Sequence, residues 1–492
     1  MAKSNLADKV MSGMKWKAVE RLFLQLINAA TPMILARLLM PEDFGAVAIL
    51  TVFISIANTF VNNGLGNAIV QKKESDDLDC STVFYTQLFI AVVCYIILFF
   101  CAPLIGHIYN NNSLVPMLRV LSLSIVVGSL GAMQNVIMKK RMEFHKSFII
   151  HVSATIAYGV VGISLAYMGF GCWSLVWAGL ANSVVMRTVS VLVVKWKPTL
   201  AFSLTRLKML FSYSWKLTVG WLIGTLHQDI YTLVIGKRFS PAVLGFYNRA
   251  GSFPQIITKT VTEVVDGVMF PALSQIQSER EKLVAVTKKL LSINSFVLFP
   301  MFLGLSACSA NVIELLLTKK WLPAAPMMSI MCLTYALNSI NNSNMQVFNS
   351  MGHSEVFMKL ELIKRSVSII LLVLMSLINI YAVVLVLLLM AILSNCMNAR
   401  NNKKLLGLSY IEQIKCIAPS FLLSAVMWIA VAAISFLKLN VFIELPVQVI
   451  AGAVIYIALS YIFKLEAFKD VTEQLLIKKE RINDGKGKGG KK

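Results

Sequence analysis

Apolar segments recur along nearly the whole chain, with short polar connections between them. A helix of about 20 such residues crosses the hydrocarbon core of a bilayer. Counting the segments predicts about fourteen spanning helices. They begin near Trp16, Asp43, Ser81, Leu114, Phe148, Gly171, Ser212, Pro241, Ser292, Leu322, Val356, Tyr381, Ile414 and Val441. The pattern therefore predicts an all-α polytopic membrane protein.

The eighth segment, residues 241–271, has the length of a spanning helix but carries charges. Steps of three and four residues place Arg249, Ser252, Lys259 and Glu263 on one side of it. A charge facing hydrocarbon costs at least a few kcal/mol, so this side should face a polar cavity or other helices. Arg249 lies about 12 Å inside the segment. Glu263 is nearer the end, where it could instead reach the interface or pair with Lys259.

Three further segments carry polar residues within apolar surroundings. Thr225 and Asp229 share one face of the seventh segment. A carboxylate there is either a candidate proton or cation site or a structural partner for a base such as Arg249. In the tenth segment, the amides of residues 339–350 either bind sugar hydroxyls or bond helices together. The polar face of the first segment comprises Arg21, Gln25 and Asn28, with Glu20 adjacent.

The formal net charge is +22 at pH 7, and its distribution argues against nucleic-acid binding. Basic residues gather in short runs in alternate connections, such as Lys139, Lys140 and Arg141. The positive-inside rule places these connections and both termini in the cytoplasm. Residues 1–15 lack the apolar region of a cleavable signal peptide, so we expect the first segment to direct insertion.

The composition excludes a soluble protein and offers no catalytic centre. The chain is 57% hydrophobic and 14% charged, whereas soluble domains carry about 25% charged residues. Its 8 cysteines and 5 histidines show no metal-ligand spacing, so no metal or cofactor is predicted. There is no GxxxxGK[ST] phosphate loop and no connection long enough for a catalytic domain. We expect the chain to move a substrate and not to be an enzyme.

The two halves of the chain look duplicated. At a shift of 200 residues, Pro41 aligns with Pro241 and Gly45 aligns with Gly245. An even number of spans in each copy predicts two six-helix bundles related by a pseudo-twofold axis along the membrane normal. The expected parts are an N-terminal bundle (1–194), an amphipathic linker helix on the cytoplasmic face (195–211), a C-terminal bundle (212–405), two extra helices (406–466) and a basic cytoplasmic tail (467–492).

Two stretches resemble a known family. Residues 36–73, ARLLMPEDFGAVAILTVFISIANTFVNNGLGNAIVQKK, resemble the start of bacterial polysaccharide flippases, especially those that export O-antigen-like, colanic-acid-like and teichuronic-acid-like repeat units. Residues 243–277 resemble a second signature, which is shared with the multidrug/oligosaccharidyl-lipid/polysaccharide exporter superfamily. The resemblance implies two six-helix bundles plus two C-terminal helices in the cytoplasmic membrane.

The resemblance also implies a substrate. It would be an undecaprenyl-diphosphate-linked oligosaccharide, flipped from the inner to the outer leaflet by alternating access, with a glycan polymerase and a chain-length regulator as further partners. A diphosphate needs a cationic cavity. The candidates are basic residues (Arg21, Arg187, Lys216, Arg249, Lys259), ion-coupling carboxylates (Glu20, Asp229, Glu263) and polar lining residues (Gln25, Asn28, Asn62, Thr225, Ser252, Asn342).

Two other functions stay open at this point. A transporter of the peptidoglycan precursor or of drug cations would share the fold, although a drug-cation exporter should have a net acidic cavity. A membrane-embedded glycan polymerase or acyltransferase would need a large outer loop or a buried catalytic His or Asp, and neither is evident in the sequence.

Overall fold

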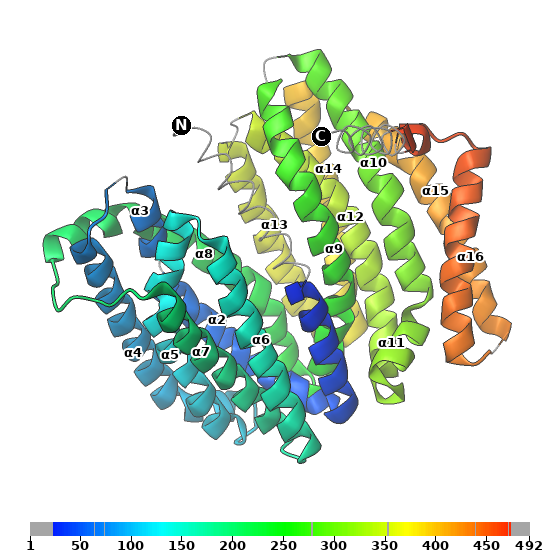
Figure 1. Cartoon of the computed structure of the whole chain (residues 1–492). Helices are drawn as coiled ribbons and strands as arrows, with labels where there is room; N and C mark the ends of the chain where they lie inside the picture. The colour runs from blue at the N-terminus through cyan, green and yellow to red at the C-terminus, as the bar shows by residue number, and fades with distance from the viewer. Residues whose placement is uncertain are drawn as a thin grey trace, which may run out of the picture. The chain divides into compact units, whose positions relative to one another are not determined.

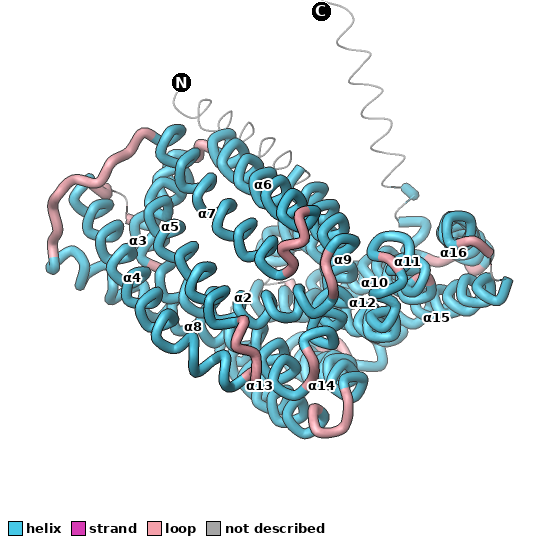
Figure 2. Tube along the Cα trace, turned by 90° about the horizontal axis from the view of Figure 1, so that it is seen from below, coloured by secondary structure: helices cyan, strands magenta, loops and turns pink. Residues whose placement is uncertain are grey.

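The computed structural model describes residues 23–62, 64–72, 74–276, 279–351, 354–437, 439–470 and 472–473. Every regular element in these ranges is a helix, as Figure 2 shows, which confirms the all-α fold class. The predicted site residues Glu20 and Arg21 lie outside the described residues. The same is true of the Glu263 side chain, although its backbone is helical.

Contacts divide the chain into two compact units, Met1–Asn248 (unit 1) and Arg249–Lys492 (unit 2). Within unit 1, α5 packs against α4 and α7, α6 packs on α7, and α8 packs along α2 (Figure 1). Its described helices are Phe23–Leu38, α2 (Pro41–Asn62), α3 (Leu65–Gln71), α4 (Asp77–Ile108), α5 (Leu114–Arg141), α6 (Phe144–Tyr167), α7 (Cys172–Val194) and α8 (Leu204–Arg238).

Unit 2 takes up the remainder of α9 (Pro241–Gln275), whose first turns belong to unit 1. Within unit 2, α10 packs against α12 and α15, α12 packs against α14, and α16 packs on α15 at the edge of the unit (Figures 1 and 2). Its other helices are α10 (Arg280–Ala307), α11 (Ser309–Leu317), η1 (Lys319–Ala324), α12 (Ala325–Ser350), α13 (Ser354–Met375), α14 (Ile380–Leu406), α15 (Tyr410–Ile434), η2 (Ser435–Leu437) and α16 (Val441–Ile462).

The helices begin and end at residues suited to those positions. The side chain of Asp76 accepts a hydrogen bond from the Asp79 backbone at the start of α4, and Asp79 returns the contact, which forms a capping box. Ser409 and Glu412 form the same motif at the start of α15. Gly407 ends α14 with φ +79°, a left-handed conformation that glycine adopts without steric cost.

Within the described residues a helix covers each expected spanning segment, the first of them from Phe23 onward, and residues near 356–400 form two helices, α13 and α14, as the sequence predicts. Among the described helices, 9 are long and apolar enough to cross a membrane. The polytopic fold is therefore confirmed, whereas the number of about fourteen crossings stays a prediction.

The connection between α7 and α8 differs from the sequence prediction. Residues 195–203 are not helical, and the backbone N–H of Thr199 donates to the Ser81 hydroxyl of α4 at 3.0 Å. The helix α8 then begins at Leu204 and continues through the expected seventh span. The prediction of a separate surface helix over 195–211 was therefore wrong. Its amphipathic pattern belongs to the first turns of α8, while hydroxyl groups of α4 accept hydrogen bonds from the backbone that precedes α8.

The repeat pattern and the contacts assign α8 differently. The repeat places it at the start of the second half of the chain, whereas α8 packs along α2 and falls in unit 1. A helix can belong to one repeat and pack on the other. The predicted limits of the two bundles, 1–194 and 212–405, stay predictions.

The two prolines and two glycines of the repeat lie in contact with one another. A Cβ atom built on Gly45 would lie 1.8 Å from the carbonyl oxygen of Pro241, and one built on Gly245 would lie 2.1 Å from the carbonyl oxygen of Pro41. All four residues belong to unit 1. The contact is reciprocal, since each copy offers its glycine to the other copy's proline, as local twofold symmetry requires.

Candidate functional site

The predicted polar residues lie mainly on helices that are not among the strongly apolar spans. The 9 candidate spans do not include Phe23–Leu38, α8, α9, α12 or α13. All but two of the described candidates are on these helices: Gln25, Asn28, Lys216, Thr225, Asp229, Arg249, Ser252, Lys259, Glu263 and Asn342. A spanning helix with this polarity needs protein or water beside it. The described structure therefore concentrates the candidate residues on the helices least suited to lipid.

The helices α2 and α8 meet through polar side chains inside unit 1. The hydroxyl of Ser55 donates to the carboxylate of Asp229, which is half-buried. One turn away, the hydroxyls of Thr59 and Thr225 lie 3.2 Å apart. The structure thus brings the predicted residues Thr225 and Asp229 together in one seam and gives Asp229 a hydroxyl partner. Ion coupling through Asp229 stays a prediction.

Arg187 connects two helices of unit 1. Gln134 of α5 is 1% exposed and, in the amide orientation that satisfies both of its polar atoms, accepts from Arg187 Nη1 at 2.9 Å. The same amide donates to the carbonyl oxygen of Gly131 at 3.2 Å. The arginine stem packs beside Gly131, where a built Cβ would lie at an ordinary contact distance of 3.5 Å from Arg187 Cδ. Arg187 thus forms a hydrogen bond that connects α7 to α5. Its contact with a substrate stays a prediction.

The other predicted residues differ in exposure. Gln25, Arg249, Ser252 and Asn342 are half-buried, and the Ser252 hydroxyl donates to the Arg249 carbonyl oxygen at 2.8 Å within α9. Those that are exposed are Asn28, Asn62, Lys216 and Lys259.

The amides of α12 bond helices together in unit 2. Asn344 donates to Gln413 of α15 at 3.0 Å and accepts from Asn402 of α14 at 2.7 Å. Asn341 accepts from Asn398, which also accepts from Lys364 Nζ at 2.9 Å. For these amides the structure shows helix packing, one of the two interpretations of residues 339–350. Lys364 is 5% exposed and is paired with Glu361 of its own helix at 3.3 Å.

A polar cavity of about 570 Å³ lies within unit 1, and Asn62 is the one predicted site residue in its lining. Gln87 of α4, Asn135 of α5, His151 of α6 and Trp221 of α8 also line it. Gln87, Asn135 and His151 lie on apolar helices of spanning length, where a polar residue equally suits helix packing, and Trp221 is one of two tryptophans of α8. The only sequence signal was the cluster of asparagines around Gly64.

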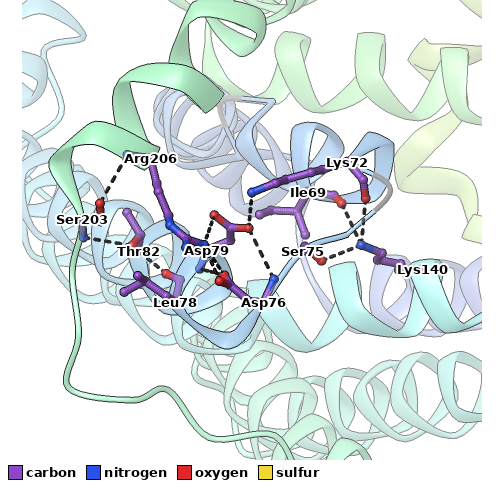
Figure 3. A network of polar contacts seen from close by, with 10 residues as sticks. All are labelled: Ile69, Lys72, Ser75, Asp76, Leu78, Asp79, Thr82, Lys140, Ser203 and Arg206. Carbon is purple, nitrogen blue, oxygen red and sulfur yellow. Dashed lines mark hydrogen bonds and ion pairs between the residues drawn. The ribbon is translucent and has the colours of Figure 1, made fainter.

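An ion-pair network fixes the end of unit 1 where α4 begins (Figure 3). The buried carboxylate of Asp79 lies 2.5 Å from Lys72 Nζ and 3.0 Å from Arg206 Nη1. Lys140 donates to the Lys72 carbonyl oxygen at 2.9 Å. The network connects α3, α4, α5 and α8.

Asp76 extends this network at the start of α4. A hydrogen bond from the Asp79 backbone, together with Arg206, lowers the pKa of Asp76 to about 2. Because this pKa lies below the ordinary 3.8, the contribution to stability is fully present above about pH 4 and is lost as the pH falls from there through about 2.

Replacing Asp79 with asparagine is expected to lower the free energy of unfolding of unit 1 by about 2 kcal/mol, because the change removes the buried partner of two cations. Solvent reaches Lys72 and Arg206, whose side chains are each 33% exposed, and this limits the loss. Thermal unfolding of the detergent-purified protein measures it. Glu74→Gln, at an exposed position nearby, is the matched control, and equal melting curves for the two variants would show that the network contributes nothing.

The described residues contain no group of three or more His, Cys, Asp or Glu that could hold a metal ion.

Sequence comparison decides the family. The chain matches the family described as "Polysaccharide biosynthesis protein" over residues 34–326, a range that includes both stretches that carry the resemblance. The chain belongs to this family. Its relatives include the lipopolysaccharide biosynthesis protein WzxC of Escherichia coli K12, which is 29% identical over 69% of each chain. The succinoglycan biosynthesis transport protein ExoT of Rhizobium meliloti is 25% identical over 67% of this chain and 66% of its own.

The fold of this family member also has a solved counterpart. The structure of the lipid II flippase MurJ in an inward closed conformation superposes with a TM-score of 0.70 and covers 92% of this chain and 99% of its own. The two sequences are 16% identical, so the likeness shows the fold alone. The chain therefore shares the helical fold of that structure over almost its whole length.

Proposed function

We propose that this chain is a flippase for lipid-linked oligosaccharides. It moves undecaprenyl-diphosphate-linked repeat units from the inner to the outer leaflet of the bacterial cytoplasmic membrane by alternating access, for the synthesis of a surface polysaccharide. It is a transporter and not an enzyme. Membership of a polysaccharide biosynthesis family, a relative described as a transport protein and a fold shared with a lipid flippase support the proposal.

The observation that carries the proposal is the concentration of polar residues on a few membrane-length helices, above all α8 and α9. Passage of a sugar headgroup needs such an interior, while the prenyl chain remains in the lipid. The Ser55–Asp229 and Thr59–Thr225 contacts support this in α8, since they form a polar seam within the bundle.

Basic residues supply the charge that a diphosphate requires. Arg249, Lys259, Arg187 and Lys216, with Arg21 outside the described residues, are the proposed cationic contacts. An inside-negative membrane potential favours the direction of transport, because export of an anion gains about 2.3 kcal/mol per charge at 100 mV. Glu20, Asp229 and Glu263 are the proposed groups for ion coupling. The net positive set favours this substrate over a drug cation.

The proposed setting follows from the charges of the connections. Both termini are in the cytoplasm, because the basic runs lie on that side. Repeat units delivered to the outer leaflet are substrates for a glycan polymerase and a chain-length regulator, which are the proposed functional partners.

Deletion of the gene tests the function. We expect lipid-linked repeat units to accumulate on the cytoplasmic leaflet and the surface glycan to disappear, in a strain that has no second flippase. The measurements are extraction of lipid-linked oligosaccharides, their accessibility to an impermeant glycosidase on spheroplasts, and quantification of surface glycan. Normal surface glycan in such a strain would refute the proposal.

A further inference from the structure

The polar cavity of unit 1 has the size and chemistry of a ligand pocket. Its volume of about 570 Å³ falls within the range of small-molecule sites. It is lined by residues of α2 to α6 and of α8, all from unit 1, and is open on one side. The wall combines amides, a hydroxyl, an imidazole and an indole, so it can exchange several hydrogen bonds with one ligand.

Gln87 is the strongest sign of a missing partner. Its side chain lines the cavity and is 2% exposed, yet its carbonyl oxygen Oε1 receives no hydrogen bond. Buried amide oxygens are nearly always paired, because an unpaired one forfeits its bonds to water. Because Oε1 itself has almost no accessible surface, the side chain must turn towards the cavity for an entering donor to complete this amide.

A break in a spanning helix lies at the same cavity. The second span is interrupted between α2 and α3, where Gly64 adopts φ +68°. A Cβ atom built on Gly64 would lie 3.1 Å from the carbonyl oxygen of Ser214 in α8. The residues on either side of the break that line the cavity are Asn62 and Asn67, both exposed. Because α2 alone has 22 residues, the length of a full span, the break lies at the end of this span, beside the cavity. The break and the unpaired amide are separate observations that indicate the same location.

The electrostatics of the cavity suit a sugar better than a diphosphate. Lys139 and Glu143 both line it and carry opposite charges, and Glu143 is paired with Lys146 at 2.8 Å. An anion would therefore meet a carboxylate as well as an ammonium group. Trp221, 42% exposed, offers an apolar aromatic face on which the C–H face of a pyranose can pack.

We propose that this cavity binds a sugar ring of the transported oligosaccharide, through the amides of Gln87 and Asn135 and the indole of Trp221. The inference rests on the flippase function and assigns the sugar to a site in unit 1 that is separate from the basic residues proposed for the diphosphate. Basic residues at this end of unit 1 place the cavity towards the cytoplasm by the positive-inside rule, where the repeat unit is loaded.

Binding to the purified full-length protein in lipid nanodiscs tests the proposal. The probe is the oligosaccharide released by partial acid hydrolysis of the host strain's surface polysaccharide, observed by saturation-transfer NMR, with inorganic diphosphate as the comparison ligand. We expect saturation of the sugar ring protons. Gln87→Leu and Trp221→Leu should each weaken sugar binding about tenfold, the loss expected for one good contact, and leave diphosphate binding unchanged.

Matched controls separate the cavity from its surroundings. Trp215→Leu changes an exposed indole of α8 outside the cavity, and Gln71→Leu changes an exposed amide at the end of α3. Neither should alter sugar binding. Should Gln87→Leu fail to fold, as its melting curve would reveal, Trp221→Leu at the exposed rim still decides the question.

Two results would overturn the proposal: no saturation of ring protons in the unaltered protein, or equal sugar binding in the cavity variants and the controls. Neither result depends on export. Trapped repeat units in the deletion strain together with absent sugar binding would retain the flippase and reject this pocket. Sugar binding that depends on Gln87 together with normal surface glycan in the deletion strain would do the reverse.

Discussion

Replacing Gly45 with alanine is expected to lower the free energy of unfolding by about 3 kcal/mol, which corresponds to a fall in Tm on the order of 10 °C. The new methyl group would lie 1.8 Å from the carbonyl oxygen of Pro241 and 2.6 Å from its carbonyl carbon. Both are backbone atoms, so no side chain can turn aside, and the first turns of α2 and α9 must separate. Thermal unfolding of the detergent-purified protein, followed by tryptophan fluorescence, measures the effect.

The symmetry of this contact supplies a second variant and a control. Gly245→Ala should produce a similar loss, because its methyl group would lie 2.1 Å from the Pro41 carbonyl oxygen. Gly220→Ala in α8 should leave Tm unchanged or raise it, since a Cβ there meets nothing within 4 Å and alanine favours a helix by about 1 kcal/mol. If Gly45→Ala melts together with Gly220→Ala, α2 and α9 do not approach as the structure shows.

The duplicated motif illustrates how much of the fold follows from sequence. Hydrophobic segments of spanning length locate the helices, because a bilayer interior permits few other structures, and each expected segment is helical where the structure describes it. The alignment of Pro41 with Pro241 and of Gly45 with Gly245 was visible as a repeat. That these equivalent residues touch one another was not, since an internal alignment relates positions without saying which of them meet.

Connections were less predictable than helices. Residues 195–211 have the pattern of an amphipathic helix, but the chain over 195–203 instead extends along α4. The deciding partners are hydroxyl groups such as Ser81, more than one hundred residues earlier in the chain. A local sequence pattern carries no information about a hydrogen-bond partner so far away in the chain. Tertiary contacts therefore decide whether such residues form a helix or a loop.

Some residues of the candidate site could be predicted from the sequence and others could not. Thr225 and Asp229 were found because their spacing places both on one helix face, and the structure pairs each with α2. Gln87 and Trp221 were missed because they lie on different helices and come together only through the packing of α4 and α8 around one cavity. Amides also serve packing, as Asn344 does between α14 and α15. Burial and hydrogen-bond partners distinguish an amide that lines a cavity from one that bonds helices together. Only a three-dimensional structure supplies this information.

Arg249→Ala is expected to reduce surface glycan by about 10- to 100-fold, the loss that follows from removing one charge-assisted contact to a phosphate. Arg249 is half-buried on α9, about 12 Å from the start of that helix, at a depth where an arginine is retained for a polar interior. Arg249→Lys should retain part of the export, because it keeps the charge and loses the planar fork that binds phosphate oxygens in pairs. Quantification of surface glycan in the complemented deletion strain measures both variants.

Two controls distinguish loss of transport from loss of protein. The amount of membrane-inserted protein and its Tm should match those of the unaltered chain, because a half-buried position tolerates truncation of a side chain better than a packed core does. Arg238→Ala removes an equal charge from the exposed end of α8 and should leave export intact. If neither Arg249 variant changes surface glycan, the polar side of α9 is structural. The diphosphate must then be bound by other cations, of which Arg187, already held by Gln134, and the exposed Lys216 are the next to replace.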